Sequence, residues 1–148
     1  MENPITIAVD AMGGENSPEK VIKGISIHSA NSKKVNYKIY GDENLIKPLL
    51  NKNSIKSEVY EIFHTSNLIK DSDSALSAAK KGKDTSLWLS IDSLKNNESD
   101  GIVSAGNTGA LFLIAKLNLK MIQNIDKPAL SGLWPNKYGM NVVLDLGA

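Results

Sequence analysis

Short apolar runs alternate with amphipathic stretches along the chain. The run at 6–10 is apolar up to a terminal acid, which is typical of a buried parallel strand that leads into a loop. Further strands are expected at 36–40, 58–64, 101–104, 129–133 and 142–146, and helices at 17–31, 43–50, 74–81, 85–96 and 108–123. This alternation predicts an α/β fold, a three-layer α/β/α sandwich around a mostly parallel sheet.

Local patterns refine three of these elements. Ser17 is expected to be the N-cap of the first helix, with Pro18 at the first helical position and Glu19 in the first turn. The helix at 108–123 is apolar on almost every side, so we expect it to be buried or to lie against a partner. The polar, turn-rich stretch at 65–73 is a candidate mobile loop.

A glycine-rich turn between a strand and this apolar helix is the first candidate site. Gly106 and Gly109 allow the backbone to approach a ligand, and the N–H groups at a helix N-terminus suit phosphate. Ser104, Asn107 and Thr108 add hydroxyl and amide donors. The alternative is that Asn107 or Thr108 only caps the helix and the glycines only pack it. The turn has neither the P-loop ending nor the spacing of a dinucleotide-binding fingerprint.

Acidic residues followed by glycine mark two other expected strand ends. Asp10 precedes Gly13 and Gly14, and Asp145 precedes a glycine at the end of the chain. Ligands of parallel sheets bind beyond the carboxyl ends of the strands, so we expect these residues on the same edge as the glycine-rich turn. A plain tight turn is the alternative for the segment after Asp10.

Other conspicuous side chains are interpreted as structural. His28 and His64 lie far apart with no third ligand, which disfavours a metal site or a catalytic base. The lysines at 80–83 are expected on a solvated face. Trp88 and Trp134 are expected in the core or in an interface.

Composition restricts the chemistry further. The 148 residues are 41% hydrophobic and 22% charged, with a net charge of +1, which gives no global attraction to nucleic acid. All 17 basic residues are lysine, so any anion must be bound without a guanidinium group. Without cysteine there is no thiolate nucleophile or thiolate metal site. Neither a signal peptide nor a membrane span is apparent, so a cytoplasmic location is expected.

Five segments together resemble the PlsX family of bacterial phosphate acyltransferases. They are IAVDAMGG, the Gly41-Asp42 pair, GIVSAGNTGALF, IDKPAL and VVLDLGA, in that order. The resemblance implies a fold similar to those of phosphotransacetylase and isocitrate dehydrogenase. It also implies transfer of a fatty acyl group from acyl-[acyl carrier protein] to inorganic phosphate, for phospholipid synthesis. The implied partners are acyl carrier protein, a membrane glycerol-3-phosphate acyltransferase and a second copy in a homodimer, in the cytoplasm or peripherally at the membrane.

The predicted loop suits that reaction. Phosphate is already an oxyanion and a thiol is a good leaving group, so the enzyme mainly has to orient phosphate and stabilise the developing oxyanion. We expect Asn107 and Thr108 to act on the reacting groups, without a metal or cofactor. The other expected phosphate- or substrate-binding residues are Ser104, Gly106, Gly109, Asp10, Gly13, Gly14 and Asp145.

Two departures from the family pattern matter. Lys127 stands where the family usually has arginine, and family members are more than twice as long. We therefore expect residues 1–148 to be the N-terminal part of a phosphate acyltransferase domain, truncated and impaired in activity. The alternatives are a non-catalytic or split-gene remnant, and a nucleotide-binding oxidoreductase, which the missing fingerprint disfavours.

Overall fold

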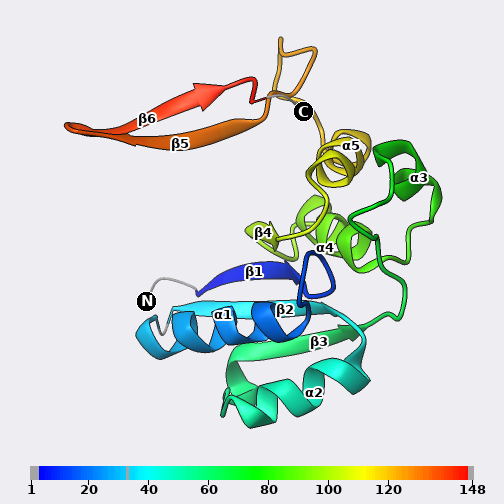
Figure 1. Ribbon diagram of the computed structural model, residues 1–148, viewed down its shortest axis with the longest axis vertical. Helices are drawn as coiled ribbons and strands as arrows, with labels where there is room; N and C mark the ends of the chain where they lie inside the picture. The colour runs from blue at the N-terminus through cyan, green and yellow to red at the C-terminus, as the bar shows by residue number, and fades with distance from the viewer. Residues whose placement is uncertain (1–3, 33, 147–148) are drawn as a thin grey trace.

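A four-stranded parallel sheet forms the centre of the computed structural model, which describes residues 4–32 and 34–146 (Figure 1). The strands are β1 (Ile5–Asp10), β2 (Val35–Gly41), β3 (Tyr60–His64) and β4 (Gly101–Ser104). Their order is β3-β2-β1-β4, and every neighbouring pair is parallel. The predicted parallel α/β fold is confirmed.

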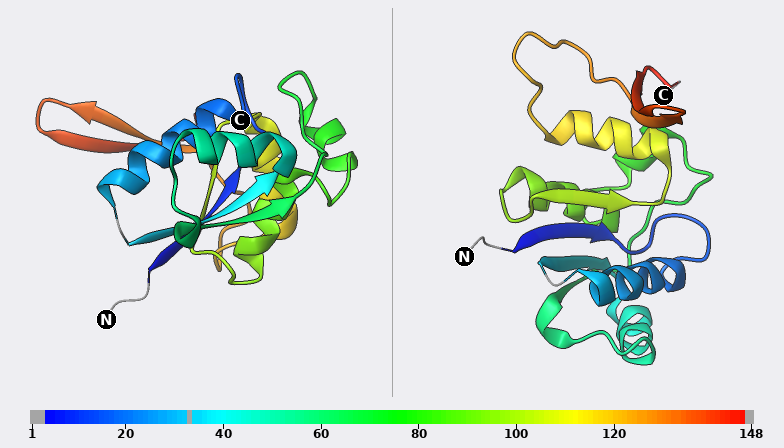
Figure 2. Two further views of the ribbon diagram at one scale, coloured as in Figure 1. Left: turned by 90° about the horizontal axis from the view of Figure 1, so that it is seen from below. Right: turned by 90° about the vertical axis from the view of Figure 1, so that its left-hand side faces the viewer.

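Helices cover both faces of the sheet and create two separate cores. One face carries α1 (Glu19–Asn31) and α2 (Glu43–Lys52), and the other carries α4 (Ser86–Lys95), beside α3 (Ala75–Lys80) and α5 (Thr108–Asn118). The left panel of Figure 2 shows the sheet between α1 and α2 on one side and α4 on the other. Ile22 and Ile39 belong to the first core, and Ile91 and Ile114 to the second. This is the expected three-layer arrangement.

The strand register places the carboxyl ends of the central strands together. Asp10 at the end of β1 lies opposite Tyr40 of β2 and Ser104 of β4. The loops that follow β1 and β4 therefore leave the sheet side by side, which explains how the segments after Asp10 and after Ser104 come together. The last two strands of the chain differ from this pattern.

The last two strands form a separate antiparallel hairpin. They are β5 (Ser131–Asn136) and β6 (Gly139–Leu144), and they pair only with each other (Figure 1). The prediction of two further strands in the same parallel sheet is wrong. Only Lys137 and Tyr138 separate the two strands, and a connection this short can join only antiparallel neighbours. Trp134 is 61% exposed on this hairpin, so its predicted place in the core is wrong, and an interface role stays a prediction.

Two helix ends also differ from the prediction. The first helix begins at Glu19, with Pro18 at the N-cap position and no side-chain cap. The Ser17 hydroxyl instead donates to the Gly13 carbonyl (2.6 Å), because the preceding loop folds back on itself. The last helix, α5, ends at Asn118 rather than near residue 123. It is not buried all round, since Leu117 is 61% exposed.

Trp88, His28 and His64 were expected to have structural roles, and each has identifiable surroundings in the structure. Trp88 is buried in the second core, as predicted. The His28 ring nitrogen Nδ1 lies 2.5 Å from the Tyr37 hydroxyl, and His64 Nδ1 accepts from the Glu43 N–H at 3.2 Å. Within the part of the chain that the structure describes, no group of three or more His, Cys, Asp or Glu residues is placed to hold a metal ion.

Candidate functional site

The two glycine-containing loops at the carboxyl edge of the sheet are in direct contact. A Cβ atom added to Gly13 would lie 2.5 Å from an Asp10 carboxylate oxygen and 3.0 Å from the Gly106 nitrogen. One added to Gly106 would lie 3.0 Å from the Gly13 Cα atom. Neither position has room for a side chain. Glycine is therefore required for the two loops to pack backbone against backbone.

Gly14 must be glycine for two reasons. Its φ angle is +88°, in the region that L side chains rarely adopt. An added Cβ would also lie only 2.3 Å from the Ala105 carbonyl oxygen. The predicted pairing of the loop after Asp10 with the loop after Ser104 thus has a definite geometric basis. Whether Gly13 and Gly14 also touch a substrate stays a prediction.

The Asp10 carboxylate joins three segments of the chain. Asp10 is 2% exposed, and it accepts hydrogen bonds from the hydroxyls of Ser86 (2.6 Å) and Ser104 (2.8 Å) and from the Met12 N–H (3.3 Å). Ser104 in turn accepts from the Gly106 N–H at 3.2 Å. A buried carboxylate needs such partners, because an unpaired charge in the interior is costly. Asp10 therefore fixes the position of the glycine-rich turn.

Sequence analysis missed Ser86 as part of this site. Ser86 is buried at the start of α4, directly after Thr85, whose hydroxyl caps the helix by accepting from the Trp88 N–H. In the sequence, Ser86 is one of many serines and stands 76 residues from its partner Asp10. Only the topology of the parallel sheet, which brings α4 against β1, could have indicated it.

The side chain of Asn107 is used by the protein itself. Its Oδ1 atom caps α5 by accepting from the Ala110 N–H at 2.9 Å. Its Nδ2 atom donates to the carbonyls of Asp73 (2.8 Å) and Asp71 (3.1 Å). The alternative in which Asn107 caps the helix is confirmed. A contact of this side chain with the reacting groups stays a prediction.

The loop that Asn107 holds is also fixed by an ion pair. Asp73 lies 2.5 Å from the Lys81 ammonium and accepts from the Lys70 N–H at 2.7 Å. The hydrogen bond from Lys81, followed by that from the Lys70 backbone, lowers the pKa of Asp73 below its ordinary value of 3.8. The lysine cluster is thus partly paired rather than wholly solvated. The mobility predicted for residues 65–73 stays a prediction, and these contacts connect that loop to the glycine-rich turn.

Free backbone donors remain at the start of α5. Within residues 4–32 and 34–146, the N–H groups of Thr108 and Gly109 donate no hydrogen bond, whereas the next one, that of Ala110, donates to Asn107. These donors lie at the positive end of an 11-residue helix, and Thr108 is exposed. Such an arrangement can bind an anion such as phosphate. It requires no arginine.

Asp145 does not lie on the edge expected for it. It follows β6, which belongs to the separate hairpin rather than to the parallel sheet, and it is exposed with a φ angle of +59°. No hydrogen bond joins its side chain to another described residue. The expectation that both acidic strand ends share one edge with the glycine-rich turn is therefore wrong, because the short β5–β6 connection directs the chain away from the sheet. A substrate contact of Asp145 stays a prediction.

Comparison with known proteins identifies the family. A sequence model described as "fatty acid synthesis protein" matches residues 5–148. The chain belongs to this family. It is 56% identical to a phosphate acyltransferase of Pelagibacter ubique over 148 residues, which are all of this chain and 44% of that protein. It is 45% identical to one of Parvibaculum lavamentivorans and 42% identical to one of Rhodospirillum rubrum, covering 41% and 42% of those proteins.

These relatives confirm the resemblance to phosphate acyltransferases. The chain spans less than half the length of the curated relatives that it matches. The aligned region contains both glycine-containing loops, Asp10 and the whole of α5. Among the described residues, no helix combines the length and the apolar character that crossing a membrane requires.

Proposed function

We propose that the start of α5 binds inorganic phosphate in an enzyme that transfers a fatty acyl group from acyl-[acyl carrier protein] to phosphate. The observation that carries this proposal is the pair of free N–H groups of Thr108 and Gly109, next to the packed glycine loops. The names of the relatives support the transfer of an acyl group. The product is acyl phosphate, an activated acyl donor for phospholipid synthesis.

In the proposed reaction, a phosphate oxygen attacks the carbonyl carbon of the thioester. A C–O bond forms, and the C–S bond then breaks. The sulfur leaves with that bonding pair and takes up a proton from the phosphate or from water. Donors at the helix N-terminus hold the phosphate and the developing oxyanion, which lowers the barrier without moving at the moment of reaction. The Thr108 hydroxyl adds a further donor, while Asp10 acts through Ser104 as a positioning residue.

The proposal extends to the setting of the whole enzyme. Residues 1–148 form the N-terminal part of the α/β domain of a phosphate acyltransferase, and this chain alone has impaired turnover. The acyl donor is acyl carrier protein, and the product passes to a membrane glycerol-3-phosphate acyltransferase. The enzyme works as a homodimer in the cytoplasm, with peripheral contact to the membrane. Phosphate binding by the 148-residue chain is the part that can be tested directly.

A titration with inorganic phosphate, followed by amide chemical shifts, tests the anion site. We expect the Thr108 and Gly109 amides to move with saturation, and chloride at the same ionic strength to leave them in place. Thr108→Pro removes one N–H at a helical position where proline is well tolerated, and Asn107 before it has a ψ of 113°, which proline accepts. Thr108→Ala is the matched control, since it keeps the N–H and loses only the hydroxyl.

The outcomes separate the candidate roles. Weaker phosphate binding in Thr108→Pro than in Thr108→Ala supports binding by main-chain donors. Shifts confined to surface lysines, with Thr108 and Gly109 unmoved, would refute the site. Thiol release from acyl-[acyl carrier protein] that depends on phosphate tests the reaction itself. Phosphate binding without thiol release would identify this chain as a binding remnant rather than an active enzyme.

A further inference from the structure

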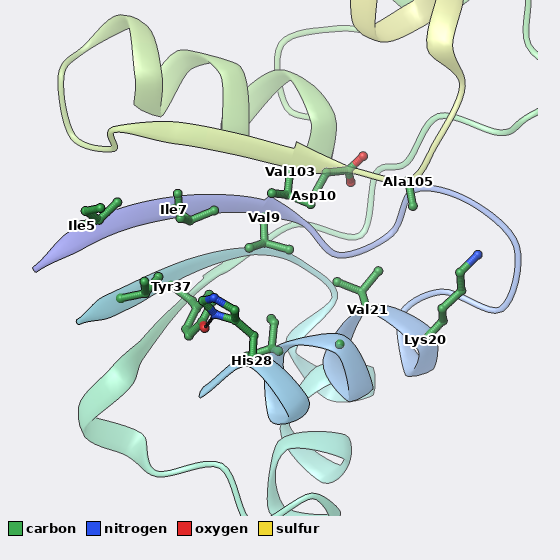
Figure 3. Close-up of a pocket in the computed structure, with 13 residues that line it drawn as sticks. Ile5, Ile7, Val9, Asp10, Lys20, Val21, His28, Tyr37, Val103 and Ala105 are labelled. Carbon is green, nitrogen blue, oxygen red and sulfur yellow. Dashed lines mark hydrogen bonds between the residues drawn. The ribbon is translucent and has the colours of Figure 1, made fainter. Parts of the chain in front are cut away.

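An open apolar groove runs along the face of the sheet that carries α1. Its cavity volume is about 530 Å³, and its walls come from β1, β2, β4 and the inner side of α1 (Figure 3). Val9 and Val103 line the sheet side, and Val21 and Ile25 line the helix side. The helix α1 follows β1 and α2 follows β2, and β2 lies on the opposite side of β1 from β4, so no described helix covers β4 on this face. Val103 is accordingly 56% exposed.

The two ends of the groove differ in chemistry. Asp10, Ala105 and Lys20 line one end (Figure 3), while Ile5 and Val35, which lie opposite each other on β1 and β2, line the other. Ala105 belongs to the glycine-rich turn and packs against Gly14, so the polar end adjoins the two glycine loops that precede the proposed phosphate site. Lys20 forms no ion pair with any described residue. The groove therefore has the Lys20 ammonium at one end, where the Asp10 carboxylate is already bonded to two serine hydroxyls, and mainly apolar side chains along the rest, with the hydrogen-bonded pair of His28 and Tyr37 among them.

We infer that this groove binds the aliphatic chain of the acyl substrate, with the reacting end of that substrate at the glycine loops and Lys20. The inference rests on the proposed function and adds a location for the acyl chain. An amphiphile with a negative head and an apolar tail complements both ends of the groove. The groove follows β1, whose six residues span about 17 Å, a length that suits a long acyl chain rather than a short one.

Gly24 provides the means of testing this inference. It lies on the groove side of α1, and a Cβ atom added there would meet nothing within 4 Å. Gly24→Leu therefore puts a side chain into the groove without a clash, and leucine favours the helix more than glycine does. Lys23→Leu is the matched control, because it adds the same side chain to an exposed position of α1 that does not line the groove.

The experiment measures fatty acid binding to the 148-residue chain by displacement of a fluorescent fatty acid. Saturated carboxylates from hexanoate to palmitate are the probes. Affinity is expected to rise by up to about fourfold for each methylene, from the free energy of burying a CH₂ group, until the groove is filled. Gly24→Leu should weaken palmitate binding at least tenfold, and Lys23→Leu should leave it unchanged. Val103→Phe blocks the groove from β4 and serves as a second variant.

The readouts distinguish this inference from the proposed function. Phosphate shifts at Thr108 should persist in Gly24→Leu, so the two sites can fail separately. Palmitate binding that both blocking variants leave unchanged would overturn the inference, as would methyl shifts that map to α5 instead of Val21 and Val103. Blocking variants that alter only the sedimentation mass would show that the groove receives a second copy of the chain, and this too would overturn it.

Discussion

Replacing Asn107 with alanine should loosen the junction between the glycine-rich turn and the loop at 65–73. The change removes the cap on the Ala110 N–H and two hydrogen bonds to the carbonyls of Asp71 and Asp73. A lost N-cap costs about 1 kcal/mol. Each lost side-chain hydrogen bond costs about 1 kcal/mol, and less for the exposed one to Asp71. The expected loss of unfolding free energy is therefore about 2–3 kcal/mol.

Asn107→Ser separates the two functions of this side chain. Serine is a good N-cap but lacks the amide NH₂ group that donates to the two carbonyls, so its expected cost is about 1–2 kcal/mol. Urea unfolding gives the free energies, and amide hydrogen exchange reports whether residues 65–73 open. Both variants should increase exchange in that loop, whereas only alanine should increase it in the first turn of α5.

Either of two results would refute this reasoning. If Asn107→Ser weakened phosphate binding tenfold while exchange at 65–73 stayed as in the unsubstituted chain, the amide would contact phosphate rather than hold the loop. The contacts to Asp71 and Asp73 would then not persist in solution. An alanine variant that costs less than about 0.5 kcal/mol would likewise show that these contacts do not persist in solution.

Three further changes test other parts of the site. Gly14→Ala should destabilise the fold by at least about 2 kcal/mol in urea unfolding, because its φ is +88° and the new Cβ would meet the Ala105 carbonyl; an unchanged midpoint would contradict this geometry. Ser86→Ala should cost about 1–3 kcal/mol of unfolding free energy, because it leaves the buried Asp10 carboxylate with one partner fewer. A double-mutant cycle with Ser104→Ala should show coupling between the two serines. Because the pKa of Asp73 is lowered in the folded chain, its ion pair stabilises the loop above pH 3.8, and this stabilisation is lost as the pH falls through the lower folded pKa. Amide hydrogen exchange at residues 65–73 should therefore rise only in that acid range. Asp73→Asn should abolish this pH dependence.

Sequence patterns predicted the parallel sheet because they depend on local and general rules. Buried strands that end in acids and glycines, joined by amphipathic helices, leave few alternatives to an α/β sandwich. The same rules placed Asp10 and Ser104 on one edge, and the register of β1 and β4 confirms it. A capping role for Asn107 or Thr108 was the alternative that their position before an apolar helix offered, and the structure assigns the cap to Asn107.

The features that failed or were missed depend on long-range geometry. Whether residues 142–146 extend the central sheet is decided by the two-residue connection before β6, and the prediction used their apolar character instead. Asp145 was misplaced with them. Ser86 carries no pattern of its own, and its role arises only because α4 begins beside the end of β1. Ser17 was assigned as a cap by type, but the loop that contains it uses its hydroxyl to bond Gly13.

The separation in sequence between Asp10 and its partners bears on how the protein acquires its site. The two serines that bond Asp10 follow it by 76 and 94 residues, so the loops cannot come together until β4 has joined β1. Closing such long loops is slow, because the chain loses entropy before any stabilising contact forms. More than a hundred residues must therefore leave the ribosome before the two loops can pack around Asp10. Until then, β1 is an edge strand with an unsatisfied acid at its end, a state that chaperones commonly shield.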